Sequence, residues 1–347
     1  MVRFIGGRFG NNVSAPGGGA SPPSVYTSRD QWWMQKASSW PNYIETTGIT
    51  ASGGTKITPG NGYIYHFFTS TGAFTVNTKS PNAPSNTLDY IIIAGGGSGG
   101  GEYSGPNQCC GGGGGAGGYR TGSYPFTNTT YPVTIGAGGP VPAAGRNPGS
   151  RGGNSVAFSI TSTGGGGGGH YPGGTVDPAA PGGSGGGGGR RGGSSAYGSG
   201  NTPPVSPPQG NDGGYGEAPP STGYDAGGGG GGAGGVGTPT YPGNGGVGIA
   251  AFSGDTGIPP SYGTPGPSAG RWFAGGGGGG MFGSGTGGAG GGAGAPGSVP
   301  LPDSAHGQAA TVSTGGGGSG GRSGTGPAPD ASGGQGGSGI VIVRYLA

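Results

Sequence analysis

Nine nearly pure glycine runs dominate this chain after residue 94, and they constrain its fold more than any other feature. Only 12 glycines precede that point, whereas 93 lie in the 253 residues that follow. Leucine occurs three times in 347 residues, so a conventional side-chain core of this size cannot form. Long helices are also excluded, because a helical glycine costs about 1 kcal/mol and a proline about 3 kcal/mol. The runs are 95–101, 111–118, 164–169, 185–189, 227–235, 275–280, 285–294, 315–321 and 333–339.

The glycine runs have two possible structures. They could be flexible linkers, the usual state of glycine-rich segments. The alternative is a bundle of polyproline II-type helices, which have about three residues per turn and direct every N–H and C=O outward, toward neighbouring helices. The aromatic residues between the runs and the low charged fraction of 7% favour the ordered bundle. Four small residues interrupt the runs and are expected at the bundle surface: Ala116, Ala233, Ala289 and Ser319.

The segments outside the runs predict β-structure. Residues 62–78 carry aromatic and β-branched residues on both sides of Ser70–Gly72, which indicates a hairpin. Residues 88–94 form a short apolar run typical of a buried strand, and the closing segment 339–347 is too apolar to be left exposed. We expect this last strand to return to the sheet begun by 63–68 and 88–94. Further strands are expected at 131–139 and 155–163.

These patterns predict a mainly β or irregular fold with very little α-helix. A small β-sandwich or sheet base would close the bundle of glycine helices. We interpret the chain as three regions: an attachment or oligomerisation segment (1–45), a β-rich base (46–94, completed by the later strands) and a glycine-rich bundle with display loops (95–338).

Three of the four tryptophans lie in the first 45 residues. Residues 28–40 could form a short helix, with Ser28 as the N-cap and Pro41 as the stop. This aromatic segment either docks on a partner or folds back on the following strands. The candidate attachment residues are Phe4, Phe9, Trp32, Trp33 and Trp40.

Charge and composition exclude several classes of function. The net charge is +3 and Arg190–Arg191 is the only adjacent basic pair, which argues against binding to nucleic acid. The sequence has no apolar stretch of about 20 residues, so no membrane insertion is expected. The first ten residues lack the apolar region of a secretory signal.

Catalysis has little support in the sequence. His66, His170 and His306 lack local partners for a catalytic triad, and the many G-x-G-x-x-G matches follow from composition alone. Asp212 and Asp225 have no EF-hand-like spacing. We therefore expect no enzyme activity, no cofactor and no metal. The adjacent Cys109 and Cys110 are two thiols or a vicinal disulfide, and they are too few for a metal site.

Four transitions from a strand-like segment into a glycine run suggest a common direction. They begin the runs at 95, 164, 275 and 315. If these runs are parallel, the segments that follow them, 102–110, 170–184, 281–284 and 322–332, share one end of the bundle. Aromatic residues between the runs either form a recognition surface or shield the bundle edge. The candidate receptor-loop residues are Tyr103, His170, Tyr171, Tyr197, Tyr215, Tyr224, Tyr241, Tyr262, Trp272 and Phe282.

Several segments resemble the glycine-rich domain proteins of tailed phages, cyanophages included. They are LDYIIIAGGG (88–97), GGGGGAGGYR (111–120), YPVTIGAGG (131–139), SITSTGGGGGG (159–169) and SGIVIVRY (338–345). The resemblance implies a non-enzymatic virion protein whose glycine runs pack as a polyproline II sandwich. It would be made in the infected bacterial cytoplasm and carried on a tail fibre or the capsid surface.

The resemblance also implies partners. The N-terminal segment would contact other virion proteins, with a homotrimer as one arrangement, and the loops would bind a host cell-surface glycan or protein. A tail-fibre or tip adhesin is the leading hypothesis. The alternative is a capsid or tail decoration without a receptor. An ice-binding protein and an extracellular-matrix protein are weaker hypotheses, because the runs show no repeated Thr or Ala face and the start shows no signal peptide.

Overall fold

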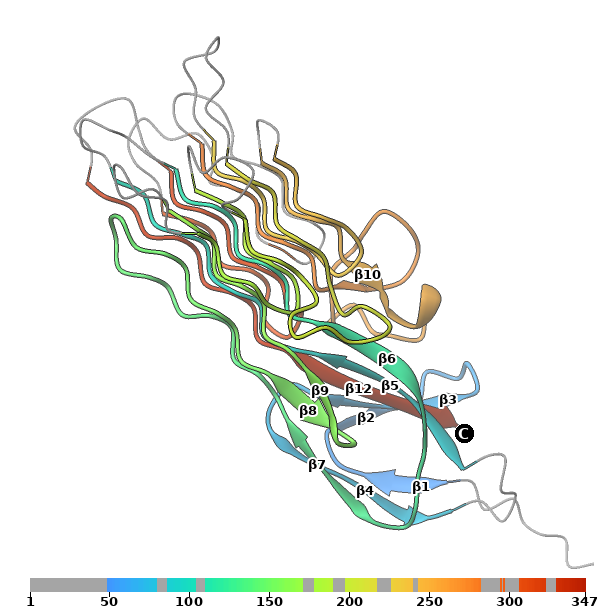
Figure 1. Cartoon of the computed structure of the whole chain (residues 1–347). Helices are drawn as coiled ribbons and strands as arrows, with labels where there is room; N and C mark the ends of the chain where they lie inside the picture. Colours follow the sequence, from blue (N-terminus) through green and yellow to red (C-terminus); the bar gives the residue numbers. More distant parts are fainter. Residues whose placement is uncertain are drawn as a thin grey trace, which may run out of the picture.

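The computed structural model describes residues 49–79, 86–103, 110–170, 178–189, 197–216, 226–239, 243–281, 294, 296, 306–322 and 329–347. Within these residues the chain forms twelve β-strands and one short 3-10 helix, and no α-helix. Figure 1 shows the strands gathered at one end and the glycine runs leading away from them as parallel traces. The proposed attachment residues of the first 45 positions lie outside the described part of the chain.

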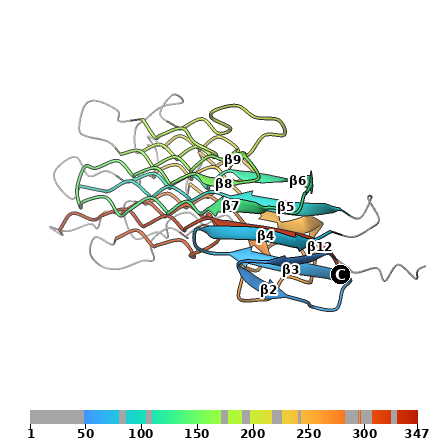
Figure 2. The ribbon, with the colours of Figure 1, turned by 90° about the horizontal axis from the view of Figure 1, so that it is seen from below.

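Ten of the strands form two five-stranded antiparallel sheets. The first sheet has the order β1 (Thr50–Ser52), β4 (Gly72–Thr78), β7 (Thr130–Thr134), β8 (Ser155–Ala157) and β9 (Ile160–Ser162). The second has the order β2 (Thr55–Ile57), β3 (Tyr63–Phe68), β12 (Ile340–Leu346), β5 (Thr87–Ile93) and β6 (Tyr119–Pro125). Figure 2 shows both sheets from below, at the end of the molecule opposite the outer ends of the glycine runs.

The closing strand β12 lies in the middle of the second sheet. Val341 pairs with Phe68 of β3 on one side and with Ile92 of β5 on the other. This confirms the expected return of the last strand to the sheet begun by the two early strands. The chain therefore leaves the sheet after β5, returns to it once as β6, and closes it with β12 after the rest of the glycine body.

Two hydrophobic cores lie on opposite faces of that sheet. Val341, Val343 and Tyr345 of β12 face a core shared with the first sheet, which makes the base a sandwich. Ile340 and Ile342, at the alternate positions, face a second core toward the glycine runs. The near-continuous apolar sequence of β12 follows from this burial on both faces.

The expected hairpin around Ser70–Gly72 is wrong. β3 and β4 do not pair, because each belongs to a different sheet. The short connection turns the corner of the sandwich, and the rings of Phe68 and Phe74 meet across it in an edge-to-face contact at 6.4 Å. Aromatic residues that suggested cross-strand pairs serve instead as contacts between the two sheets.

Two other strand expectations need correction. The segment expected as one strand at 155–163 is a tight hairpin of β8 and β9, turned by Phe158 and Ser159 at φ values of 54° and 60°. The edge strand β6 was not expected at all, since Gly122 and Pro125 obscure its pattern. The segment expected as a strand at 131–139 is a strand only through Thr134.

Hydrogen bonds between glycine runs follow a three-residue period. In the run after β5, the amides of Gly97 and Gly100 donate to Gly115 and Gly112, both at 2.9 Å. The intervening amides donate to two other segments: Gly95 and Ser98 to 147–153, and Gly96 and Gly99 to 331–337. Each neighbour is therefore met once every three residues, with the partner running in the opposite direction.

The run at 111–118 is the centre of the bundle. Its amides donate to three runs, and its carbonyls accept from three others, which gives six neighbours. The acceptor runs are 163–169, 226–232 and 315–321, and the donor runs are 94–100, 184–187 and 277–280. Backbone groups that would otherwise be buried without partners are satisfied in this way.

Close backbone contact explains why the runs need glycine. A Cβ atom at Gly277 would overlap the backbone carbonyl of Gly318 in the adjacent run. The small residues that interrupt the runs were expected at the bundle surface, and this expectation is wrong. Ala116 and Ser319 are both 0% exposed. Ala116 packs in the second core, and the Ser319 hydroxyl accepts a hydrogen bond from the Gln308 amide at 2.7 Å. Ala233 is also buried, and Ala289 lies outside the described residues.

Candidate functional site

The four runs predicted to share a direction do share it. The amides of Gly165 and Gly168 donate to Gly95 and Ser98, and those of Gly318 and Gly321 donate to Gly97 and Gly100. In both cases the residue numbers of donor and acceptor increase together, so the runs at 164–169 and 315–321 are parallel to 95–101. Gly277 and Gly280 donate to Gly114 and Gly111, so the run at 275–280 is antiparallel to the central run, as 95–101 is. All four runs therefore point away from the β-sandwich in the same direction.

Gly111 and Gly112, at the start of the central run, bring the outer ends of these four runs to one level. Gly112 accepts from Gly100 and donates to Gly169, while Gly111 accepts from Gly280 and donates to Gly321. We call this end of the bundle the distal end. Its described boundary consists of the residues that follow the four runs: Glu102, His170, Met281 and Arg322.

The distal end is built from buried side chains. The exposed fractions of Glu102, His170, Met281 and Arg322 are between 0% and 2%. Backbone bridges from Glu102 to Ala331 and from Ala226 to Met281 join the returning chain to the outgoing runs. Charged residues are rarely fully buried in proteins, so the burial of Glu102 and Arg322 at the run ends marks a fixed platform at the distal end.

Two candidate receptor residues lie at this platform. Tyr103 is half-buried, and the guanidinium of Arg146 lies over its ring, 4.0 Å from the ring centre. His170 is buried just after its run. Tyr197 and Tyr215 are half-buried on the bundle, where Gly214, next to Tyr215, accepts from Gly188. Tyr171, Tyr224, Tyr241 and Phe282 lie outside the described residues.

The other two candidates lie at the base and have structural contacts. Tyr262 stacks on Phe67 with ring centres 4.0 Å apart. Trp272 belongs to β11 (Trp272–Phe273), which pairs with β10 (Ile249–Ala250), and its indole N–H donates to the carbonyl of Ser268 at 3.1 Å. The structure therefore does not bring the ten candidates together into one surface.

Sequence reasoning missed an ionic network at the base. The Arg344 guanidinium pairs with Asp255 and, at 3.1 Å, with Asp89. The Tyr65 hydroxyl donates to Asp255 at 2.5 Å. Burial alone would raise the pKa of Asp255, but the Tyr65 hydrogen bond, the Gly257 amide and the Arg344 charge together lower it. This network ties the segment after β10 to β3, β5 and β12, and no local sequence motif marks it.

The described residues offer no metal-binding group of three or more His, Cys, Asp or Glu side chains. Within the same residues, no helix is long and apolar enough to cross a bilayer. Cys110 is buried at the start of the central run, and Cys109 lies outside the described part.

A family model described as the glycine-rich domain matches residues 68–346. The match covers most of the chain, so the protein belongs to the glycine-rich domain family. It begins at the end of β3 and ends in β12, and it therefore includes the whole glycine body and the strand that closes the sheet. The comparison with curated proteins returned no match.

Proposed function

We propose that this protein is a non-enzymatic virion protein, a tail-fibre or tip adhesin whose glycine bundle carries host-recognition segments at its distal end. The glycine runs would be polyproline II-type helices. Their three-residue hydrogen-bond period supports this assignment, since such a helix has about three residues per turn and no internal hydrogen bonds. The phage resemblance supplies the biological setting.

One observation supports the proposal that the bundle presents recognition segments at its distal end. Gly111 and Gly112 hold the outer ends of four parallel runs at one level. The residues that directly follow these runs, Glu102, His170, Met281 and Arg322, precede the proposed recognition segments in the sequence. A rigid scaffold that holds several connecting segments together lowers the entropy cost of binding, as the framework of an antibody does for its loops. The bundle would supply position, and the segments would supply specificity.

The proposed partners follow from the same arrangement. The distal segments would bind a glycan or protein on the bacterial surface. The first 45 residues would attach the protein to other virion components, and a homotrimer is the assembly that we propose to test first. Localisation would be the tail fibre or the capsid surface.

Binding of the labelled, isolated protein to a panel of cyanobacterial strains tests the adhesin function. We expect strain-dependent binding that is lost when 171–177 and 323–328 are both replaced by Gly-Ser segments of equal length. The control is Lys79→Gln, an exposed change at the base, which should bind like the wild type. Binding that survives the loop replacement would refute recognition at the distal end.

Localisation on particles separates the adhesin from the alternative of a decoration protein. Gold-labelled antibodies against this chain should mark the tip of the tail or fibre in electron micrographs. Labelling spread over the capsid, together with no binding to any strain, would favour a decoration protein. Absence from purified particles would refute both virion functions.

A further inference from the structure

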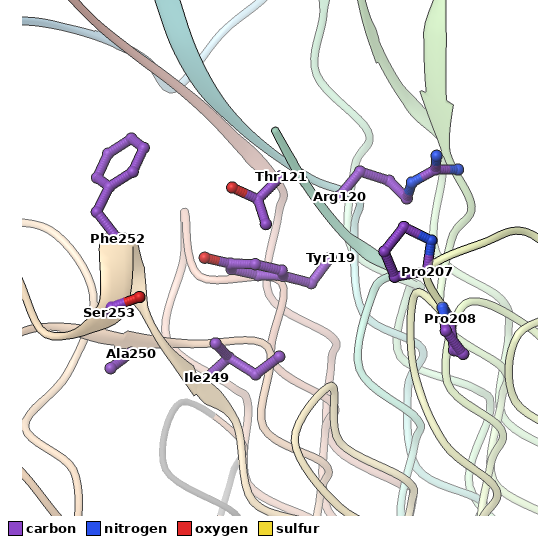
Figure 3. A pocket seen from close by; sticks show the side chains of 9 residues that line it. All are labelled: Tyr119, Arg120, Thr121, Pro207, Pro208, Ile249, Ala250, Phe252 and Ser253. Atoms are coloured by element: carbon purple, nitrogen blue, oxygen red, sulfur yellow. The ribbon is translucent and has the colours of Figure 1, made fainter. Parts of the chain in front are cut away.

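A pocket of about 250 Å³ lies on the side of the molecule, at the junction between the β-sandwich and the glycine bundle. It is separate from the distal end. Figure 3 shows it between the start of β6, the prolines at 207–208 and the segment around the 3-10 helix η3 (Ala251–Ser253). Its lining residues are Tyr119, Arg120, Thr121, Pro207, Pro208, Ile249, Ala250, Phe252 and Ser253.

The wall formed by Phe252 and Ser253 is held in an unusual conformation. Their φ values are 44° and 57°, in the left-handed region that costs a non-glycine residue about 1–2 kcal/mol. The Phe252 ring is fixed by Arg344, whose guanidinium lies 4.0 Å from the ring centre, and by an edge contact with Tyr65. Backbone strain of this kind often marks functional sites, because the surrounding structure must maintain it.

The floor of the pocket is mainly apolar. Tyr119 is 7% exposed and presents its ring between the prolines and Phe252 (Figure 3). Its hydroxyl points toward the segment that contains Phe252 (Figure 3). Ile249 lies beneath the ring in the same view. Aromatic and proline rings offer faces that pack against the C–H groups of another ring.

Polar groups lie around this floor. The half-buried Arg120 guanidinium has no carboxylate or other hydrogen-bonding partner among the described residues, unlike Arg271 and Arg344. It lies above Pro207, on the side away from Phe252 (Figure 3). Ser253 at the opposite end is exposed. The hydroxyl of Thr121 donates to the Tyr90 carbonyl and can still accept a hydrogen bond.

We propose that this pocket binds one carboxylated sugar residue, a hexuronic acid unit of a glycan. The ring would pack on Tyr119 and Pro207, the carboxylate would pair with Arg120, and a sugar hydroxyl would meet Thr121. Arginine is the side chain best suited to a carboxylate, because its fork of donors matches the two oxygens. The volume is just below the usual range of about 300–1,000 Å³ for ligand pockets, which fits a single sugar ring.

Calorimetric titration and saturation-transfer NMR with methyl β-D-glucuronide test this site on the full chain. We expect the glucuronide to bind about tenfold more tightly than methyl β-D-glucoside. Arg120→Gln should lower the affinity for the glucuronide to that for the glucoside. Arg120→Lys should retain part of the difference between the two affinities. The matched control is Arg151→Gln, an exposed arginine on the run at 147–153, which should not change binding.

Each other outcome overturns the proposal. Equal affinity for glucuronide and glucoside would exclude recognition of the carboxylate. Equal binding of N-acetyl-aspartate N-methylamide would assign the site to acidic peptides instead of sugars. No binding of the glucuronide, or binding that persists when Ile249→Trp fills the pocket in a folded protein, would remove the site. These measurements use isolated glycosides, so their failure leaves the proposed binding to cells at the distal end untouched.

Discussion

The amide of Gly277 donates to the carbonyl of Gly114 at 2.9 Å, although the two residues belong to runs far apart in the sequence. The amide of Gly114 in turn donates to Gly318 at 2.8 Å. Three distant segments are thus joined by backbone groups alone. Such contact is possible only where no side chain separates the runs, and it makes the central run sensitive to any added atom.

Gly277→Val should abolish soluble, protease-resistant protein. The new Cβ would overlap the carbonyl of Gly318, and neither backbone can move without breaking hydrogen bonds to further runs. Limited proteolysis and size-exclusion chromatography measure the outcome. Gly72→Val is the control, because a Cβ there would lie 4.0 Å from the Phe68 ring and the position is exposed. Normal protease resistance of the Gly277 variant would contradict the packing of backbone against backbone in the bundle.

Asp255→Asn should lower the free energy of unfolding by about 1–3 kcal/mol at neutral pH, because a charge-assisted pair with Arg344 is lost. The pKa of Asp255 is lowered in the folded state, against an unfolded value of about 3.9. Its contribution is therefore present above that value and is lost as the pH falls through the folded pKa. Chemical denaturation between pH 7 and pH 2 should show less acid dependence in the variant.

Asp89→Asn is the matched comparison for this network. Asp89 pairs with the same guanidinium, but its side chain is 34% exposed, against 11% for Asp255. Solvent screening weakens exposed pairs, so the loss should be smaller. An equal or larger loss at Asp89 would contradict the assignment of Asp255 as the main anchor of the segment after β10.

His66 should make the base sensitive to mild acid. Burial lowers its pKa, although the hydrogen bond from its Nδ1 to the Gly53 carbonyl, at 2.6 Å, acts in the opposite direction. The neutral ring therefore stabilises the fold above the unfolded value of about 6.5, and this stability is lost as the pH falls below it. Unfolding free energies from pH 8 to pH 5 should decline in the wild type and much less in His66→Gln. Tyr345→Phe, which removes a hydroxyl contact but keeps the imidazole, should retain the decline.

Ser159→Gly should stabilise the protein by about 1 kcal/mol, because Ser159 is exposed and occupies the left-handed region at φ 60°. Glycine adopts this conformation without steric cost. Thermal denaturation measures the change. Ser261→Gly, at an exposed position without a positive φ, should destabilise slightly through the added freedom of the unfolded chain. A loss of stability in the Ser159 variant would contradict the turn geometry.

Features that a local sequence pattern marks could be predicted from the sequence. The position of β12 followed from a closing segment that is too apolar to be left exposed. The common direction of four runs followed from four similar transitions into glycine. Both inferences depend on patterns that neighbouring residues display together, and the hydrogen-bond register agrees with them.

Features that depend on distant contacts could not be predicted. Phe68 and Phe74 flank a turn in a way typical of a hairpin, and only the presence of two sheets decides that they pack across a corner. The burial of Ala116 depends on the six runs around it. The side pocket joins β6 to segments some 90 and 130 residues later, and the left-handed conformation of Phe252 has no marker in the sequence.

The backbone pairing around Gly111 and Gly112 has an evolutionary consequence. Their hydrogen bonds do not depend on side-chain identity beyond the need for glycine, so the register of the runs is insulated from the residues that connect them. Insertions, deletions and exchanges between 104–109, 171–177 or 323–328 should leave that register unchanged. Such a protein could diversify its connecting segments rapidly, even by recombination with relatives, without having to find a new fold each time.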